Sequence, residues 1–486
     1  MAPLLGQSRW AYPLWLANQH PRSLTTTASA DTRALLALVA DGDGADETFA
    51  SLAAEGIAAR LVHDGRGCEA HWILPLQAGD TLAPGAGAAY AEAVAQADGR
   101  TRIIYADDDL LDSAGRRHSP HFKPDWNREL FAHCDYLSGA ALLRVTDSHF
   151  KDVNGPDWIA ELTRKVADDC GHEESAILHL HQILHHRRAR PEISPLGPPL
   201  HPSLGPLPSV SIIIPTRNRV DLLKTCLEGL ERTSYPLKLQ IIVIDNGSDD
   251  PSTLAYLAKL DPDFATVLRD DSAFNFAALN NRAVEQATGE MLCFLNNDIA
   301  IVDPNWLVTM VAQAMRNEVG TVGARLLYPD GRIQHAGVVL GVGGGAAHAH
   351  RFLDPAETGY FHRHSLPQFT SAVTAACMVV ARDKFLAVGG FDAERFAVSF
   401  NDVDLCLRLA ERGWKSLYEP RATLVHHESV SRGFDRDPQG AARLAGELSA
   451  LQERWCTQPA DTGEGTIDPY HHPALSRFSE TFVVDI

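Results

Sequence analysis

The chain has 486 residues and a formal net charge of −19; 45% of its residues are hydrophobic and 22% are charged. This composition supports a folded core and excludes the disordered, collagen-like and coiled-coil classes. The length predicts two to three domains of about 150 residues each. The acidic balance argues against nucleic-acid binding, because phosphate neutralisation requires many lysines and arginines.

The eight cysteines are dispersed, and no two lie within three residues of each other. This spacing excludes a CxxC zinc knuckle or redox pair, and single thiols inside apolar runs favour a reducing compartment. The first 29 residues lack the apolar core of a signal peptide, and no stretch reaches the roughly 20 apolar residues that span a bilayer. We therefore predict a cytoplasmic protein that meets any membrane-bound substrate at the membrane surface.

A proline-rich segment divides the chain. Seven prolines fall within residues 191–208, where neither a helix nor an inner strand can continue because proline lacks the backbone N–H. We predict an N-terminal extension over residues 1–30, a first domain over 31–190, a linker over 191–209, a second domain over 210–440 and a helical C-terminal tail over 441–486.

The second domain opens with alternating strand and helix patterns. Residues 210–215, 239–244 and 291–295 are short apolar runs typical of buried strands, and residues 222–230 and 276–288 have helical spacing. This order predicts an α/β fold with a parallel sheet covered on both faces. Ligands of such sheets bind beyond the carboxyl ends of the strands, and polar clusters follow all three runs.

The polar clusters indicate a nucleotide site. Asp245 and Asp298 follow neighbouring strands, where a carboxylate can hold a ribose hydroxyl or a divalent cation. The alternative is helix capping, which also favours Asp, Asn and Ser. Three such clusters in series favour the nucleotide site, although neither GxGxxG nor GxxxxGK[ST] occurs near them.

Six segments in this order resemble family 2 glycosyltransferases, which have the type A nucleotide-sugar fold, a Rossmann-like mixed sheet. They are VSIIIPTRN at 210–218, IDNGS at 244–248, FLNND at 294–298, VGGFD at 388–392, NDVDLCLR at 401–408 and ATLVHH at 422–427. Residues 328–337 (YPDGRIQHAG) and 468–470 resemble the branch that builds bacterial surface polysaccharides, the O-antigen and rhamnosyl transferases.

The resemblance implies a nucleotide-binding role for four residues. Pro215, Thr216 and Asn218 would line the nucleotide pocket, and Asp245 would contact the base or the ribose. Thr216 and Asn218 belong to the polar loop after the first strand. Asp245 ends the second strand.

The resemblance also implies a Mn²⁺ or Mg²⁺ ion that bridges the donor diphosphate. Asn296 and Asp298 occupy the outer positions of the family's DxD motif, so an asparagine replaces the first aspartate here. We expect Asp298 to bind the ion directly and Asn296 to lie beside the nucleotide. His426 would join the metal or the diphosphate, and imidazole suits Mn²⁺ better than Mg²⁺. The alternative for His426 is a buried structural histidine.

Asp402 matches the catalytic base of the family. An acceptor hydroxyl must lose its proton as it attacks the anomeric carbon, and a positioned carboxylate can take that proton. A single displacement of this kind inverts the anomeric centre. The alternative for Asp402 is a solvated aspartate at a helix N-terminus. For Asp404, which is two residues later, function and capping remain equally open.

Histidines are frequent after this motif but irregularly spaced. A zinc site requires convergent ligands at closer spacing, so we predict solvated or acceptor-loop roles for these residues. They are His335, His348, His350, His362 and His364.

The first domain resembles a degenerate copy of the second. Residues 102–109 and 121–127 are similar to type A glycosyltransferase segments, but the two metal positions fall at Gln77 and Gly79, which supply no charge. His185 and His186 follow a final strand, as His426 does. We predict a non-catalytic partner domain, and for residues 107–109 a hydrated strand end.

Together these observations predict a metal-dependent, inverting glycosyltransferase. It would move a sugar to a lipid-linked glycan acceptor at the inner membrane surface, in O-antigen synthesis. The donor that the resemblance implies is dTDP-rhamnose. Two alternatives stay open: a pseudoenzyme that binds nucleotide sugars without turnover, motivated by Asn296, and a nucleotidyltransferase, which would require a glycine-rich loop after the first strand.

Overall fold

The computed structural model describes residues 5–18, 32–62, 72–171, 173–193, 196, 205–427, 438–455 and 468–486. The chain forms two compact units. Unit 1 contains residues 1–194, 469–476 and 483–486, and unit 2 contains residues 195–468 and 477–482. The division falls within the predicted linker, most of which lies outside the described residues.

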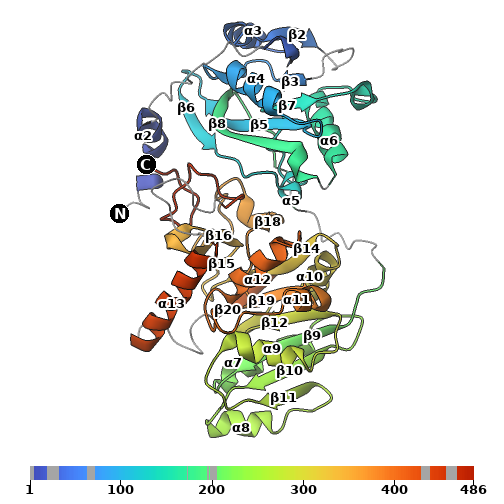
Figure 1. Ribbon diagram of the computed structural model, residues 1–486, viewed down its shortest axis with the longest axis vertical. Coiled ribbons are helices and arrows are strands. Elements are labelled where there is room, and N and C mark those ends of the chain that lie inside the picture. Colours follow the sequence, from blue (N-terminus) through green and yellow to red (C-terminus); the bar gives the residue numbers. More distant parts are fainter. Residues whose placement is uncertain are drawn as a thin grey trace. The chain divides into compact units, whose positions relative to one another are not determined.

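Unit 2 is built on a mixed ten-stranded sheet (Figure 1) with the order β11-β10-β9-β12-β19-β14-β20-β13, in which β15 and β18 pair with β14 and β20. The first four strands of that order are parallel, whereas β19 is antiparallel to both of its neighbours. The strands are β9 (Val210–Thr216), β10 (Gln240–Asp245), β11 (Ala265–Arg269), β12 (Met291–Leu295), β13 (Ile299–Ile301), β14 (Val319–Leu327), β15 (Ile333–His335), β18 (Gln368–Thr370), β19 (Cys377–Ala381) and β20 (Lys415–His426), with β16 (Val338–Leu340) and β17 (Ala346–His348) as a separate pair.

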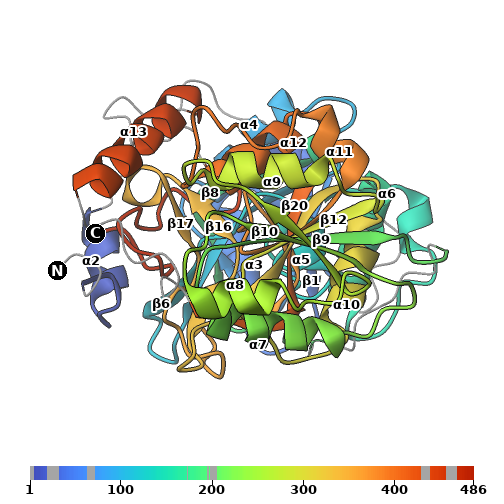
Figure 2. The same cartoon turned by 90° about the horizontal axis from the view of Figure 1, so that it is seen from below.

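Helices cover both faces of this sheet. Figure 2 shows α7 and α10 on one side of the strands and α9, α11 and α12 on the other. Apolar residues at helical spacing lie on the face of each helix that packs on the sheet. In α12, for example, Val403, Cys406 and Leu409 are buried. The helices are α7 (Val220–Glu231), α8 (Pro251–Leu257), α9 (Phe276–Val284), α10 (Trp306–Ala314), α11 (Arg382–Ala387), α12 (Asn401–Ala410) and α13 (Pro438–Trp455).

Unit 1 repeats the topology of unit 2 on a smaller scale. Its sheet has the order β2-β1-β3-β7-β5-β8-β4, and each pairing has the same direction as its counterpart in unit 2. The strands are β1 (Leu35–Ala40), β2 (Ala58–Val62), β3 (Trp72–Leu76), β4 (Thr81–Leu82), β5 (Ile103–Leu111), β6 (Arg117–His121), β7 (Ala141–Arg144) and β8 (Ile177–Arg187). The helices are α2 (Ala11–Asn18), α3 (Ala45–Ala54), α4 (Ala86–Gln96), α5 (Arg128–Phe131) and α6 (Trp158–Cys170).

The predicted α/β fold class, a Rossmann-like mixed sheet in two tandem related domains, is confirmed. Element ends differ from the prediction: the helix expected over 276–288 ends at Val284, and the strand expected over 239–244 runs from Gln240 to Asp245. The predicted helical tail over 441–486 is only partly helical: the helix α13 ends at Trp455, and the described residues 468–486 form no helix. Helix α13 packs on unit 2 through Leu451, which is fully buried. In the described residues, no helix is both long and apolar enough to cross a bilayer.

Candidate active site

A cavity of about 780 Å³ opens in unit 2 at the ends of β9, β12 and β20 and at the start of α12. Polar and apolar groups both line it, as is usual for small-molecule sites. Seven of the eight sequence-predicted site residues lie on its wall. They are Pro215, Thr216, Asn218, Asn296, Asp298, Asp402 and His426.

His426 and Asp298 lie next to each other on one wall of the cavity. Nε2 of His426 lies 3.1 Å from Oδ1 of Asp298 and 3.4 Å from Nδ2 of Asn296. Nδ1 of His426 lies 2.7 Å from Oε1 of Gln334. Because an amide oxygen only accepts hydrogen bonds, Gln334 places the imidazole proton on Nδ1. The lone pair of Nε2 then lies next to a carboxylate, an arrangement that a divalent cation satisfies.

The loop after β9 forms a second wall. Thr216 Oγ1 accepts a hydrogen bond of 2.9 Å from Asn297, and the backbone N–H of Asn218 donates to Ser248 at 2.8 Å. Asn218 and Arg219 have φ values of 53° and 52°. Left-handed backbone costs a non-glycine residue about 1–2 kcal/mol, and such strain concentrates at functional sites.

Asp402 lies in the first turn of α12. Its Oδ2 accepts a hydrogen bond from the Ala375 N–H at 3.0 Å, and its Oδ1 accepts one from the Val403 N–H at 2.9 Å. Burial raises the pKa of the Asp402 carboxyl, and these N–H donors oppose part of that rise. The preceding Phe400 has φ 60° and begins the helix at the cavity wall. The result is a fixed carboxylate with increased affinity for a proton.

Asp245 is the predicted residue that the structure does not bring to the cavity. Its carboxylate accepts from Nη1 of Arg269 at 2.6 Å and from the Ser248 N–H at 3.0 Å. The next residue, Asn246, lines the cavity instead. Asp245 therefore holds the loop that carries Asn246 and Ser248.

Asp404 has a structural environment. Its fully buried carboxylate contacts Nε of Arg408 at 2.8 Å, Nη1 of Arg454 at 3.2 Å and Nε1 of Trp455 at 3.1 Å. Because Arg454 and Trp455 belong to α13, their contacts with Asp404 join α12 to α13. Of the two roles left open for Asp404, the contacts favour the structural one.

Of the two roles predicted for the later histidines, solvated or acceptor-loop, the solvated one is wrong for three of them. His335, His350 and His364 are buried, and Nδ1 of His335 lies 2.8 Å from Nδ1 of His348. Burial holds the pKa of His335 well below its usual value, so the ring is neutral. His348 lines the cavity, which agrees with an acceptor-side position.

The matching position in unit 1 is closed. Strand pairing aligns His186 with His426 and Thr81 with Ile299, so Asp80, rather than the predicted Gly79, is the counterpart of Asp298. Nε of Arg187 lies 3.5 Å from Oδ2 of Asp80, and the Arg188 N–H donates to Oδ1 at 2.8 Å. Arg187 and the Arg188 N–H thus occupy the Asp80 carboxylate, which in this position would otherwise bind an ion.

The prediction of a hydrated strand end at residues 107–109 is also wrong. All three aspartates are buried within β5. Asp108, for example, pairs with Lys123 Nζ at 2.8 Å and with Arg190 Nε at 2.5 Å. The charges are tolerated in the interior because each is paired.

Sequence reasoning assigned no role to several lining residues. Gln334, Arg217 and Thr374 all face the cavity. Gln334 belongs to the YPDGRIQHAG segment, whose resemblance to other transferases pointed to this part of the chain. Its contact with His426 could not be predicted, because it depends on the pairing of β15 with β14. Arg217 supplies a cation suited to phosphate.

The family model described as "Glycosyl transferase family 2" matches residues 211–352. This part of the chain belongs to glycosyl transferase family 2. The resemblance predicted from the six segments is confirmed, and so is the type A class of fold. The matched residues include Thr216, Asn218, Asn296, Asp298 and Gln334 of the cavity.

Longer similarity extends over both units. An O-antigen biosynthesis protein, RfbC, of Myxococcus xanthus is 34% identical over 464 residues, covering 87% of this chain and 35% of that protein. An N-acetylglucosaminyl-diphospho-decaprenol L-rhamnosyltransferase of Mycobacterium tuberculosis is 45% identical over 73 residues, covering 15% of this chain and 22% of that protein. The chain spans less than half the length of the curated relatives that it matches.

A solved structure gives a weaker match. It is the mannosyltransferase PcManGT from Pyrobaculum calidifontis in complex with GDP-Man and Mn²⁺, with a TM-score of 0.40 and 20% identity over 56% of this chain and 69% of that one.

Proposed function

We propose that the family 2 unit transfers a sugar from a nucleoside diphosphate donor to the hydroxyl group of a glycan acceptor. The observation that carries this proposal is the meeting of Asp298, His426 and Asp402 on one cavity, although they come from three separate elements. The volume of about 780 Å³ is of the size that small-molecule sites have.

A divalent cation fits the residues around His426. A carboxylate oxygen of Asp298 and an imidazole nitrogen lie 3.1 Å apart, and Gln334 fixes the imidazole tautomer. Oxygen and nitrogen donors suit Mn²⁺ or Mg²⁺, and the imidazole favours Mn²⁺. When bound there, the ion would stabilise the charge that develops on the leaving nucleoside diphosphate. Arg217, on the loop after β9, adds a second cation to the lining of the cavity.

Asp402 is the general base of the proposed reaction. The acceptor oxygen forms its bond to the anomeric carbon as the bond from that carbon to the diphosphate oxygen breaks, and the hydroxyl proton passes to Asp402. A raised pKa makes this carboxylate a better proton acceptor than an exposed one. The displacement occurs once, so the configuration at the anomeric carbon inverts.

Surface polysaccharide synthesis is the proposed setting. Support comes from the O-antigen biosynthesis protein and from the rhamnosyltransferase, whose name specifies a decaprenol-linked substrate. We propose a deoxythymidine diphosphate rhamnose donor and a lipid-linked acceptor at the cytoplasmic face of the membrane. Unit 1 has no catalytic role in this proposal, because Arg187 and Arg188 occupy its counterpart of the metal position.

The competing proposal is a nucleotide-sugar-binding pseudoenzyme. Asn296 motivates it, because the motif has lost one carboxylate. Full-length protein should be incubated with a panel of nucleotide sugars and Mn²⁺, and the release of nucleoside diphosphate measured. Release with one donor, abolished by EDTA, supports transfer. Tight nucleotide binding without turnover of any donor, with and without lipid-linked acceptors, would establish the pseudoenzyme.

A further inference from the structure

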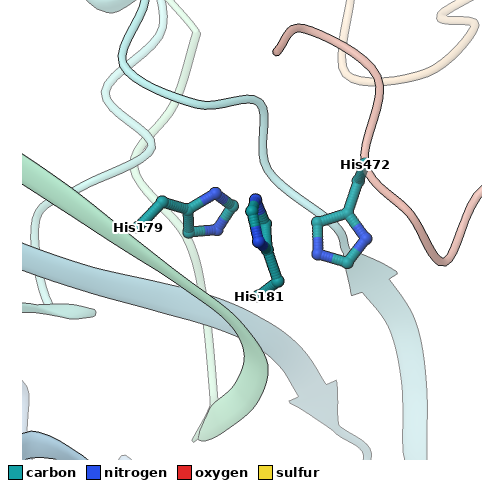
Figure 3. A group of neighbouring side chains, drawn as sticks. All are labelled: His179, His181 and His472. Carbon is teal, nitrogen blue, oxygen red and sulfur yellow. The ribbon is translucent and has the colours of Figure 1, made fainter. Parts of the chain in front are cut away.

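Three histidines of unit 1 gather their rings at one point (Figure 3). His179 and His181 come from β8, and His472 comes from the C-terminal segment 469–476 that belongs to the same unit. One nitrogen of each ring lies within 4.8 Å of the other two. None of these residues lies at the Asp80 position that corresponds to Asp298, so this cluster is separate from the family's metal motif.

Two carboxylates enter the same cluster. Oδ1 of Asp125 lies 3.0 Å from Nδ1 of His179 and 2.9 Å from Nε2 of His181. Oδ1 of Asp107 lies 3.1 Å from Nε2 of His179, and Oδ2 of Asp107 lies 2.8 Å from Nε2 of His472. Both ring nitrogens of His179 are therefore next to a carboxylate.

The contact between Asp107 and His472 is close but not aligned as a hydrogen bond. Asp107 is fully buried and His472 is 5% exposed, yet neither Oδ2 nor Nε2 has a hydrogen bond of good geometry. Buried polar atoms are normally satisfied, so an unsatisfied pair that faces the same point indicates a missing partner. A cation between them would satisfy both atoms.

Surrounding groups hold the ligands in place. The ring of Tyr105 stacks on His179 with centroids 4.3 Å apart, and the ring of Phe122 stacks on His472 at 5.1 Å. The Lys123 N–H donates to Oδ1 of Asp107 at 2.8 Å. His181 is the most exposed of the three histidines, with 37% of its side chain accessible, so an ion can enter from that side. The site thus has packed ligands, His179 and His472, on one side and a solvent-accessible ligand, His181, on the other.

We propose that His179, His181 and His472, with Asp125 and Asp107, form a site for a divalent transition metal, of which Zn²⁺ is the first candidate. Three imidazoles favour Zn²⁺, Co²⁺ or Ni²⁺ over Mg²⁺ and Ca²⁺, which take oxygen ligands. Two carboxylates balance the charge of the ion. His179 would bind with one nitrogen and donate from the other to a carboxylate, a common arrangement around protein-bound zinc.

The ion would join the C-terminal segment to β8. That segment already contacts the rest of unit 1 through the Asp125 N–H, which donates to the Pro469 carbonyl at 2.7 Å. A ligand that binds only the folded state raises stability, and a metal that joins distant segments does so by closing a long loop. The proposed role is structural, and it does not depend on sugar transfer in unit 2.

The test is metal binding to the untagged full-length protein, stripped with EDTA and free of nucleotide. Co²⁺ titration followed by visible absorption, and Zn²⁺ competition against it, should give one tight equivalent and a higher Tm. His181→Ala and the milder Asp125→Asn should each weaken Zn²⁺ binding at least about tenfold. The exposed His118→Ala should leave binding unchanged.

A variant of the other unit separates this site from the proposed catalytic one. The double variant Asp298→Ala, His426→Ala should retain the tight equivalent, which would place the ion in unit 1 whatever the outcome for transfer. The proposal is overturned if the wild-type protein takes up no Zn²⁺ or Co²⁺ at micromolar concentration. It is equally overturned if His181→Ala and Asp125→Asn, folded by circular dichroism, bind as tightly as the wild type.

Discussion

Oε1 of Gln334 lies 2.7 Å from Nδ1 of His426 and thereby fixes which nitrogen of that imidazole faces the cavity. The contact joins β15 to the end of β20. It makes Gln334 a positioning residue for the proposed cation site, because a misplaced tautomer would turn an N–H towards the ion.

Gln334→Leu tests this relationship. The substitution removes the acceptor for His426 Nδ1, so we expect the Mn²⁺ concentration for half-maximal transfer to rise about 10–100-fold. Affinity for the nucleotide in the absence of metal should change little. The exposed Gln286→Leu is the matched control. An unchanged Mn²⁺ requirement in Gln334→Leu would contradict the positioning role of Gln334.

Asn296→Asp restores the first carboxylate of the motif. Nδ2 of Asn296 lies 3.4 Å from Nε2 of His426, so a new carboxylate at this position would face the proposed ion. Because added ligand charge strengthens binding of hard cations, we expect about a tenfold lower Mn²⁺ requirement. Donor hydrolysis at a series of Mn²⁺ concentrations measures it. A higher requirement would mean that Asn296 serves the nucleotide only through its amide.

The pH dependence of transfer follows from Asp402. A base must be deprotonated to act, and burial raises the pKa of this carboxyl above its ordinary value of 3.8. We therefore expect kcat/KM to fall as the pH decreases through that raised pKa, so the acid limb lies above pH 3.8. Nucleotide binding, measured over the same range, should not follow this limb. A flat kcat/KM profile down to pH 4 would contradict the assignment of the base.

Much of unit 2 could be predicted from the sequence because local patterns determine it. Apolar runs such as that of β9 are buried along their whole length, and the polar residues that follow them reach the cavity. Where prediction failed, contacts distant in sequence decide the outcome. Asp107 is buried rather than hydrated because two residues distant in sequence, His179 and His472, pack against its carboxylate. Asp245 lies away from the cavity because Arg269, on the next strand, takes its carboxylate.

Asp404→Ala should affect stability rather than chemistry. Removal of this buried carboxylate leaves Arg408 and Arg454 without it, and breaking such a pair costs about 3 kcal/mol or more. Urea denaturation of the protein, followed by its fluorescence, measures the loss in the free energy of unfolding. Asp330→Ala, which breaks the exposed pair with Arg332, should cost much less, because water and salt screen surface ion pairs. Equal losses in the two variants would contradict a structural role for Asp404.

The measurement that tests the account most directly is the comparison of wild-type protein with Asp402→Asn, in sugar transfer and in nucleotide binding side by side. The variant keeps the shape of the side chain but cannot accept the hydroxyl proton, so transfer should fall by about 10²–10⁴-fold. The Kd for the nucleotide with Mn²⁺, measured by calorimetry, should stay within about twofold of the wild-type value, since the base touches the acceptor rather than the donor diphosphate. Retained transfer in Asp402→Asn, or a loss of nucleotide affinity as large as the loss of transfer, would contradict the proposed mechanism.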